Sequence, residues 1–116
     1  MSAASVIRDL QCELDRAARP ATKVWFQNYL KHVIQYRGVK SPDVSKIVSK
    51  WRLEHELDKL PAGVQLKIAS SLMRQMMAED KFAGIFYIQR YLLGQLAHQE
   101  LIRELESLFQ AGALWD

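Results

Sequence analysis

The chain has 116 residues, of which 49% are hydrophobic and 25% are charged, and its formal net charge is +3, all typical of one small globular domain with a buried core. The single cysteine, Cys12, excludes an internal disulfide framework and a cysteine-based zinc site. No apolar run approaches the ~20 residues that span a bilayer, so we expect no membrane segment. The lone cysteine indicates a reducing compartment, so we expect an intracellular protein, cytoplasmic or nuclear.

Apolar residues recur at helical spacing along most of the chain, and no segment alternates with the clean period of two that marks a strand. Because the implied helices are short and lack a sustained heptad, we predict an all-α fold of about six helices, in antiparallel pairs stacked as a solenoid or an irregular bundle. The expected inward residues are, in chain order, Val6, Ile7, Leu10, Leu14 and Ala17 or Ala18 in the first helix; Trp25, Phe26, Tyr29, Leu30, Val33 and Ile34 in a second that runs to Gly38; Val44, Ile47, Val48 and Trp51 in the third; Val64, Ile68, Leu72 and Met76 in the fourth; Phe82, Ile85, Phe86, Ile88 and Leu92 in the fifth; and Leu101, Ile102, Leu105 and Leu108 in the sixth.

The connection between the second and third helices has the clearest turn chemistry. Gly38 can adopt the positive φ that ends a helix, and Ser41 is a suitable N-cap for the next one. Pro42 would then occupy the first helical position, where its missing N–H costs nothing. A second helix start is expected at Glu79 and Asp80, which we interpret as a cap with ion pairs at the surface.

Positive charge is concentrated between residues 19 and 52. This segment carries eight cations against one acid, Asp43, for a net of +7, whereas residues 1–18 carry −1 and residues 53–116 carry −3. A basic segment that includes a helix N-terminus is suited to phosphate groups, although an ordinary solvated surface is the simpler interpretation. If the segment binds DNA, the expected contact residues are Lys31, Arg37, Lys40, Ser41, Lys46, Lys50 and Arg52.

No other grouping of residues indicates a specific chemistry. The histidines at positions 32, 55 and 98 are scattered, and no carboxylate or cysteine pattern completes a ligand set, so no metal is expected. The five glycines form no phosphate-cradling loop, and no cofactor is expected. Three methionines, at positions 73, 76 and 77, are interpreted as core filling rather than as a groove for a partner.

Several short segments occur in a recognisable order: Tyr29-Leu30-Lys31, then YRGVKSP at residues 36–42, then a helix with two lysines, then MMAEDKFAG at residues 76–84, and Leu114-Trp115-Asp116. Together, over about residues 24–116, they resemble the DNA alkylation repair enzyme family, the alkylpurine DNA glycosylases built of HEAT-like helical repeats. The resemblance implies that residues 1–116 form a single HEAT-like domain, the N-terminal part of a longer solenoid. It also implies a curved basic surface for double-stranded, alkylated DNA.

The same resemblance implies a reaction, the hydrolysis of the N-glycosidic bond of N3- or N7-alkylated purines. The positive charge on such a base already makes it a good leaving group, so the enzyme must supply an anion near the developing oxocarbenium ion and an aromatic surface against the deoxyribose. Trp115 matches the family's aromatic residue and Asp116 matches the acid that directly follows it. The family's catalytic Asp comes about one helical turn later, so we expect this chain alone to contribute DNA contacts without excising bases.

Two other functions remain open. The first is a non-catalytic HEAT-like scaffold that binds an acidic protein. The second is a helix-turn-helix transcription factor centred on Gly38, which is less favoured because Lys46, Lys50 and Arg52 suit phosphates better than base edges. The sixth helix leads into the apolar pair Leu114-Trp115 without a polar cap, and we therefore also expect self-association through this end.

Overall fold

The structure is a computed structural model of the chain, and it describes residues 3–29, 35–95 and 98–110, with the backbone alone at residues 26–29, 98, 100 and 108–110. The described residues form six α-helices and no strand longer than an isolated bridge, which confirms the all-α prediction. The elements are α1 (Ala3–Ala17), α2 (Pro20–Tyr29), α3 (Ser41–Glu54), the 3₁₀ turn η1 (Leu57–Lys59), α4 (Ala62–Met73), α5 (Ala78–Tyr87), the π-helical turn η2 (Ile88–Leu92) and α6 (His98–Gln110).

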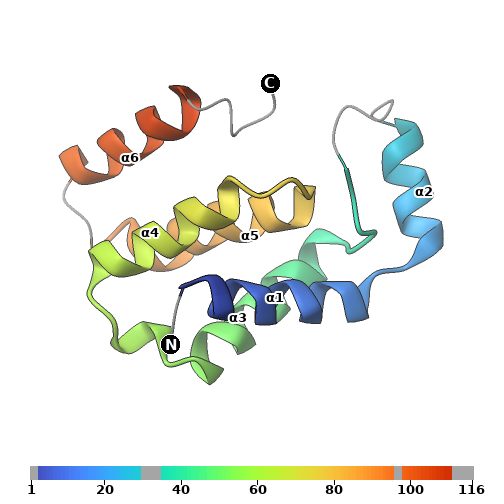
Figure 1. Cartoon of the computed structure of the whole chain (residues 1–116), viewed down its shortest axis with the longest axis horizontal. Coiled ribbons are helices and arrows are strands. Elements are labelled where there is room, and N and C mark those ends of the chain that lie inside the picture. Colours follow the sequence, from blue (N-terminus) through green and yellow to red (C-terminus); the bar gives the residue numbers. More distant parts are fainter. Residues whose placement is uncertain (1–2, 30–34, 96–97, 111–116) are drawn as a thin grey trace.

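The helices form two layers, with α1 and α4 in front of α3 and α5 (Figure 1). α1 runs antiparallel to α3, and α4 runs antiparallel to α5, so each layer takes one helix from each pair (Figure 1). The pairs then pack side by side, α3 against α5 and α1 against α4. This is the predicted arrangement of antiparallel pairs, while the assignment of the pairs to HEAT repeats stays a prediction.

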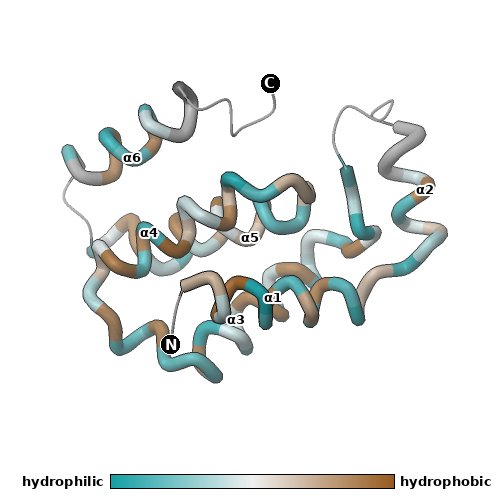
Figure 2. Tube along the Cα trace, in the orientation of Figure 1, coloured by the Kyte–Doolittle hydropathy of each residue, from teal (hydrophilic) through white to brown (hydrophobic). Residues whose placement is uncertain are grey.

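One hydrophobic core fills the space between the two layers. Hydrophobic and hydrophilic positions alternate along the helices, as an amphipathic helix in a layered fold requires (Figure 2). Trp51 of α3 and Tyr87 of α5 are almost fully buried at its centre and meet edge to face, with ring centroids 6.2 Å apart. The indole Nε1 of Trp51 donates a hydrogen bond of 2.8 Å to the carbonyl of Val6, which ties α3 to α1.

The second helix is shorter than predicted. α2 ends at Tyr29, and residues 35–40 are not helical; Gln35 instead pairs with Met77 in an isolated parallel bridge. Trp25 is 59% exposed, so its predicted inward position is wrong, because α2 stands at one end of the two layers (Figure 1). The predicted positions at residues 30, 33 and 34 lie outside the described residues.

The buried face of α4 differs from the predicted stripe. Ile68 and Leu72 are buried as predicted, whereas Val64 is 45% exposed and Met76, which follows the end of the helix, is 72% exposed. The reason is that α4 packs against α5, α1 and α6, which together cover a broad face. The further residues that this face buries are Gln65, Leu66, Ala69, Ser70 and Met73.

In α5 and η2, Ile88 and Leu92 are buried as predicted, but three other expected core residues are only partly buried. Those three are Phe82, Ile85 and Phe86. The close crossing with α4 is made instead by Ala83, Gly84 and Tyr87, all buried. A Cβ on Gly84 would lie 2.5 Å from the Ala69 carbonyl oxygen, so the two backbones approach too closely here for any side chain.

The last helix lies where it was predicted, with Leu101 and Leu105 partly buried against the core. Ile102 is exposed rather than inward, and the side chain of Leu108 lies outside the described part of the chain. The Glu104 carboxylate connects α6 to α4 through Lys67 Nζ at 3.0 Å. No helix among the described residues is both long and apolar enough to cross a bilayer.

Candidate nucleic-acid interface

The turn before α3 is fixed by a buried acid on α5. Glu79 is 0% exposed, and its carboxylate accepts hydrogen bonds from the backbone N–H groups of Arg37 (2.8 Å), Gly38 (3.1 Å) and Val39 (3.2 Å). Three backbone donors that converge on one carboxylate compensate for much of the cost of burying its charge. The predicted role of Glu79 as a surface cap is therefore wrong, since it holds a turn about 40 residues away.

Arg37 takes part in the same structural cluster. Its guanidinium forms an ion pair with Asp80, which is 1% exposed, and its Nε lies 2.6 Å from Asp15 Oδ1. The neighbouring carboxylates raise the pKa of Arg37 against the opposing effect of burial. Because the Arg37 side chain is only 8% exposed and faces two acids, we do not include it in the phosphate-binding surface.

Two of the segments that carry the family resemblance, residues 36–42 and residues 76–84, thus contact each other. Gly38 has φ of +100°, a conformation that disfavours side chains, and its N–H bonds to Glu79 of the second segment. Lys81, from the same segment, is buried and donates to the carbonyl of Met73 at 2.9 Å. Burial lowers the pKa of this lysine. The bond from Gly38 to Glu79 therefore positions α3 relative to α5, and the bond from Lys81 ties α5 to the end of α4.

The start of α3 differs from the prediction by one residue. The helix begins at Ser41, so the N-cap is Lys40, and its side chain makes no capping hydrogen bond. Pro42 has no N–H, and the N–H groups of Asp43 and Val44 already donate to the carbonyl of Lys40. This helix N-terminus is therefore expected to attract phosphate only weakly. Binding of phosphate at this face must come from the cationic side chains.

Three lysines are presented to solvent along α3 and the residue before it. Lys40, Lys46 and Lys50 are all exposed, and Lys46 and Lys50 lie one helical turn apart on the same face. Lys50 also lies 3.6 Å from Glu54, a surface pair of the kind that contributes little. Asp43 and Glu54 offset part of the positive charge of the three lysines, and the rest is available to bind a polyanion.

Arg52 is the cation on α3 whose position is most defined. Its Nε donates to the hydroxyl of Tyr87 at 3.2 Å, and its guanidinium carbon lies 4.0 Å from the ring centroid of Tyr91. Tyr91 is fixed in turn by a 2.8 Å hydrogen bond to Ser49. Tyr91 belongs to η2. Such π-helical turns are rare in proteins, and those that occur are often found at functional sites. Arg52 is therefore pre-oriented beside an aromatic surface.

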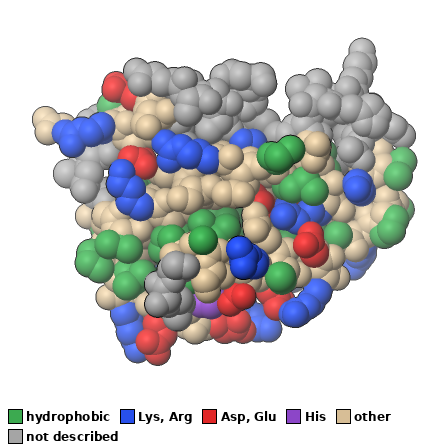
Figure 3. Space-filling model, viewed as in Figure 1, with side chains coloured by type: hydrophobic (Ala, Val, Ile, Leu, Met, Phe, Trp, Pro, Cys, Tyr) green, Lys and Arg blue, Asp and Glu red, His purple; other side chains and the backbone are tan. Residues whose placement is uncertain are grey.

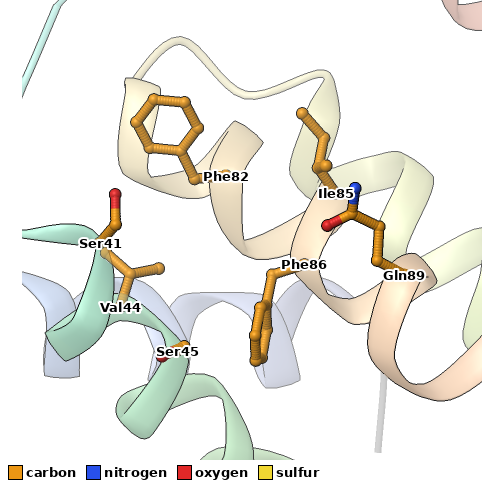
Figure 4. A pocket seen from close by; sticks show the side chains of 7 residues that line it. All are labelled: Ser41, Val44, Ser45, Phe82, Ile85, Phe86 and Gln89. Carbon is orange, nitrogen blue, oxygen red and sulfur yellow. The ribbon is translucent and has the colours of Figure 1, made fainter.

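A groove of about 200 Å³ runs between α3 and α5 (Figure 4). Its α3 side presents Ser41, Val44 and Ser45, and its α5 side carries the aromatic rings (Figure 4). No acid lines it. The α5 and η2 residues that complete the lining are Phe82, Ile85, Phe86 and Gln89.

The layer of α1 and α4 carries charges of both signs. In the view that has α1 and α4 in front, Lys and Arg side chains are interspersed with Asp and Glu (Figure 3). Ion pairs such as Lys67 with Glu104 neutralise some of this charge locally. Within the described residues, no three His, Cys, Asp or Glu side chains could together hold a metal ion. The predicted site residues Lys31, Trp115 and Asp116 lie outside the described part of the chain.

The sequence matches the family described as DNA alkylation repair enzyme over residues 10–116. The chain belongs to the DNA alkylation repair enzyme family. No curated protein and no solved structure matches it in the corresponding comparisons. Membership makes DNA the expected partner, and the exposed lysines of α3 with the pre-oriented Arg52 are the described residues best suited to it. Sequence reasoning missed both aromatic residues of this surface, because Phe86 was expected to point into the core and Tyr91 was not singled out.

Proposed function

We propose that the outer face of α3 and α5 binds the phosphates of double-stranded DNA, and that the chain serves alkylation repair in this way. The observation that carries the proposal is the set of cations on α3 and the residue before it, Lys40, Lys46, Lys50 and Arg52, in a member of a DNA alkylation repair family. Phosphate contacts of this kind fix position and orientation and carry no sequence information. That suits a protein that must find chemical damage in any sequence.

The test is the salt dependence of binding to a short duplex, followed by fluorescence anisotropy. If four cations each neutralise one phosphate, the plot of log K against log salt should have a slope of about −3.6, from about −0.9 per contact. A slope near zero would contradict the proposal. Displacement of the duplex by poly-glutamate at equal charge concentration and equal salt would instead favour the scaffold that binds an acidic protein.

The glycosylase reaction is the finer part of the proposal and needs its own assay. The resemblance assigns the aromatic contact to Trp115 and the adjoining acid to Asp116, and the chemistry would be hydrolysis of the glycosidic bond of N3- or N7-alkylated purines. We would measure release of 7-methylguanine from methylated DNA relative to the spontaneous rate. Release that is lost in Asp116→Asn would make Asp116 the catalytic carboxylate, whereas DNA binding without release would limit the chain to DNA contacts.

A further inference from the structure

A chain of hydrogen bonds runs through the core and ends at the side chain of Arg52. Gln65 Nε2 donates to the Leu60 carbonyl at 2.8 Å, and Gln65 Oε1 accepts from the Tyr87 hydroxyl at 2.6 Å. The Tyr87 hydroxyl in turn accepts from Arg52 Nε at 3.2 Å. Gln65 and Tyr87 are 1% and 0% exposed. Buried groups of α4 and α5 thus connect the loop before α4 to a cation near the end of α3.

Each bond of this chain can form in one direction only. A carbonyl oxygen accepts, so Gln65 must turn its amide nitrogen toward Leu60 and its amide oxygen toward Tyr87. An arginine Nε only donates, so the Tyr87 oxygen must accept from Arg52 and give its own proton to Gln65. Burial raises the pKa of Tyr87, which keeps that proton on the hydroxyl at neutral pH. Arg52 therefore has one defined acceptor, because any other arrangement would leave a buried polar group unpaired.

A second contact fixes the plane of the same guanidinium. Its carbon lies 4.0 Å from the ring centroid of Tyr91, whose hydroxyl lies 2.8 Å from that of Ser49. Within the described part of the chain, Arg52 forms no ion pair. With Nε bonded to Tyr87 and one face on Tyr91, the two terminal nitrogens are left for a ligand. A guanidinium edge held in this way matches two oxygens of one phosphate.

We propose that this hydrogen-bond chain and the Tyr91 ring pre-orient Arg52, so that its two terminal nitrogens hold one DNA phosphate with two hydrogen bonds. Gln65, Tyr87 and Tyr91 are then positioning residues, since they act through Arg52. This inference rests on the proposed binding of DNA by the α3 face, and it adds which cation fixes the duplex in place. The exposed lysines supply charge, whereas Arg52 is already ordered before binding. Ordering a long side chain on binding otherwise weakens affinity by about 2- to 12-fold.

The test is a double-mutant cycle on affinity for a short duplex at fixed salt, below the melting range of every variant. Tyr87→Phe removes the hydroxyl and keeps the ring in the core. It should weaken binding by about 2- to 12-fold when Arg52 is present and have no effect in an Arg52→Ala background. A general disturbance of the fold would weaken binding equally in both backgrounds. Tyr91→Leu changes a partly exposed residue, so it repeats the cycle without removing a buried hydroxyl.

Arg52→Lys separates geometry from charge. It should lower affinity and keep the wild-type salt slope, because the positive charge stays. Arg8→Lys, the same change at an exposed position on α1, should alter neither quantity. Equal losses in the two backgrounds of the cycle, or wild-type affinity in both Tyr87→Phe and Tyr91→Leu, would overturn this inference and leave phosphate binding by α3 intact. A wild-type chain that does not bind the duplex would overturn the proposed function as well.

Discussion

The buried carboxylate of Glu79 should be among the most sensitive positions in the chain. In Glu79→Gln the single remaining oxygen can accept from two of the three backbone donors, best from Gly38 and Val39, which already share Oε2 in the wild type. The new amide group then faces the N–H of Arg37, a donor like itself. A buried donor without an acceptor costs about 1–3 kcal/mol, and loss of the charge weakens the other two bonds, for a total of roughly 2–4 kcal/mol.

That cost is a large part of the roughly 5–15 kcal/mol that stabilises a typical domain. With about 4 °C per kcal/mol for a chain of this length, the melting temperature should fall by about 8–16 °C. We would follow thermal unfolding by circular dichroism at neutral pH, with Glu106→Gln as the matched control, because Glu106 is exposed on α6. Hydrogen exchange should also become faster at the amides of Arg37, Gly38 and Val39. A melting temperature within about 2 °C of the wild type would refute the reasoning.

Three further predictions concern the packing of the layers. Gly84→Ala should destabilise the crossing of α4 and α5 by about 1–3 kcal/mol, because the added carbon would lie 2.6 Å from Met73 Cγ, while Gly94→Ala, with nothing within 4 Å, should be nearly neutral in the same melts. Burial tends to raise the pKa of Glu104, but the positive charges of Lys67 and Arg74 outweigh it and lower that pKa. The stability that this carboxylate contributes above its ordinary pKa of 4.5 should therefore be lost as the pH falls below that value. Glu104→Gln should weaken this loss of stability at acid pH. An unchanged dependence of stability on pH would show that protonation of Glu104 is not coupled to unfolding. Trp51→Phe should cost about 1–3 kcal/mol, since it leaves the Val6 carbonyl without its donor, and melting at the wild-type temperature would show that water replaces the indole.

The spacing of apolar residues was sufficient to predict the buried residues of a helix where one neighbouring element covers one narrow stripe of it. The third helix is such a case. Of its four predicted inward residues, Val44, Val48 and Trp51 are buried, and Ile47 is partly buried against the core. The same spacing failed where burial depends on how many other helices surround the helix. Trp25 is as apolar as Trp51, yet it belongs to a helix at the end of the layers, where it is exposed.

The charged residues show the same limit for the candidate site. Lys46 and Lys50 were predicted to be solvent-exposed, and they are, because a helix face opposite the core needs no partner. Arg37 belonged to the same basic segment but faces Asp80, which lies 43 residues later in the sequence. Glu79 and its three backbone partners are equally distant along the chain. No spacing rule connects such pairs. The only hint in the sequence was that two adjacent acids, Glu79 and Asp80, occur at a helix start, where one is enough for a cap.

The most direct test of the central claim is to compare two double variants that each remove two positive charges from the chain. Lys46→Ala/Lys50→Ala removes charge from the α3 face, and Arg8→Ala/Arg103→Ala removes the same charge from exposed positions on α1 and α6. For duplex binding, the first variant should reduce the magnitude of the salt slope by about 1.8 and weaken affinity, from about 0.9 per lost contact. The second should keep the wild-type slope. Equal slopes and equal affinities for the two variants would contradict the assignment of DNA binding to this face.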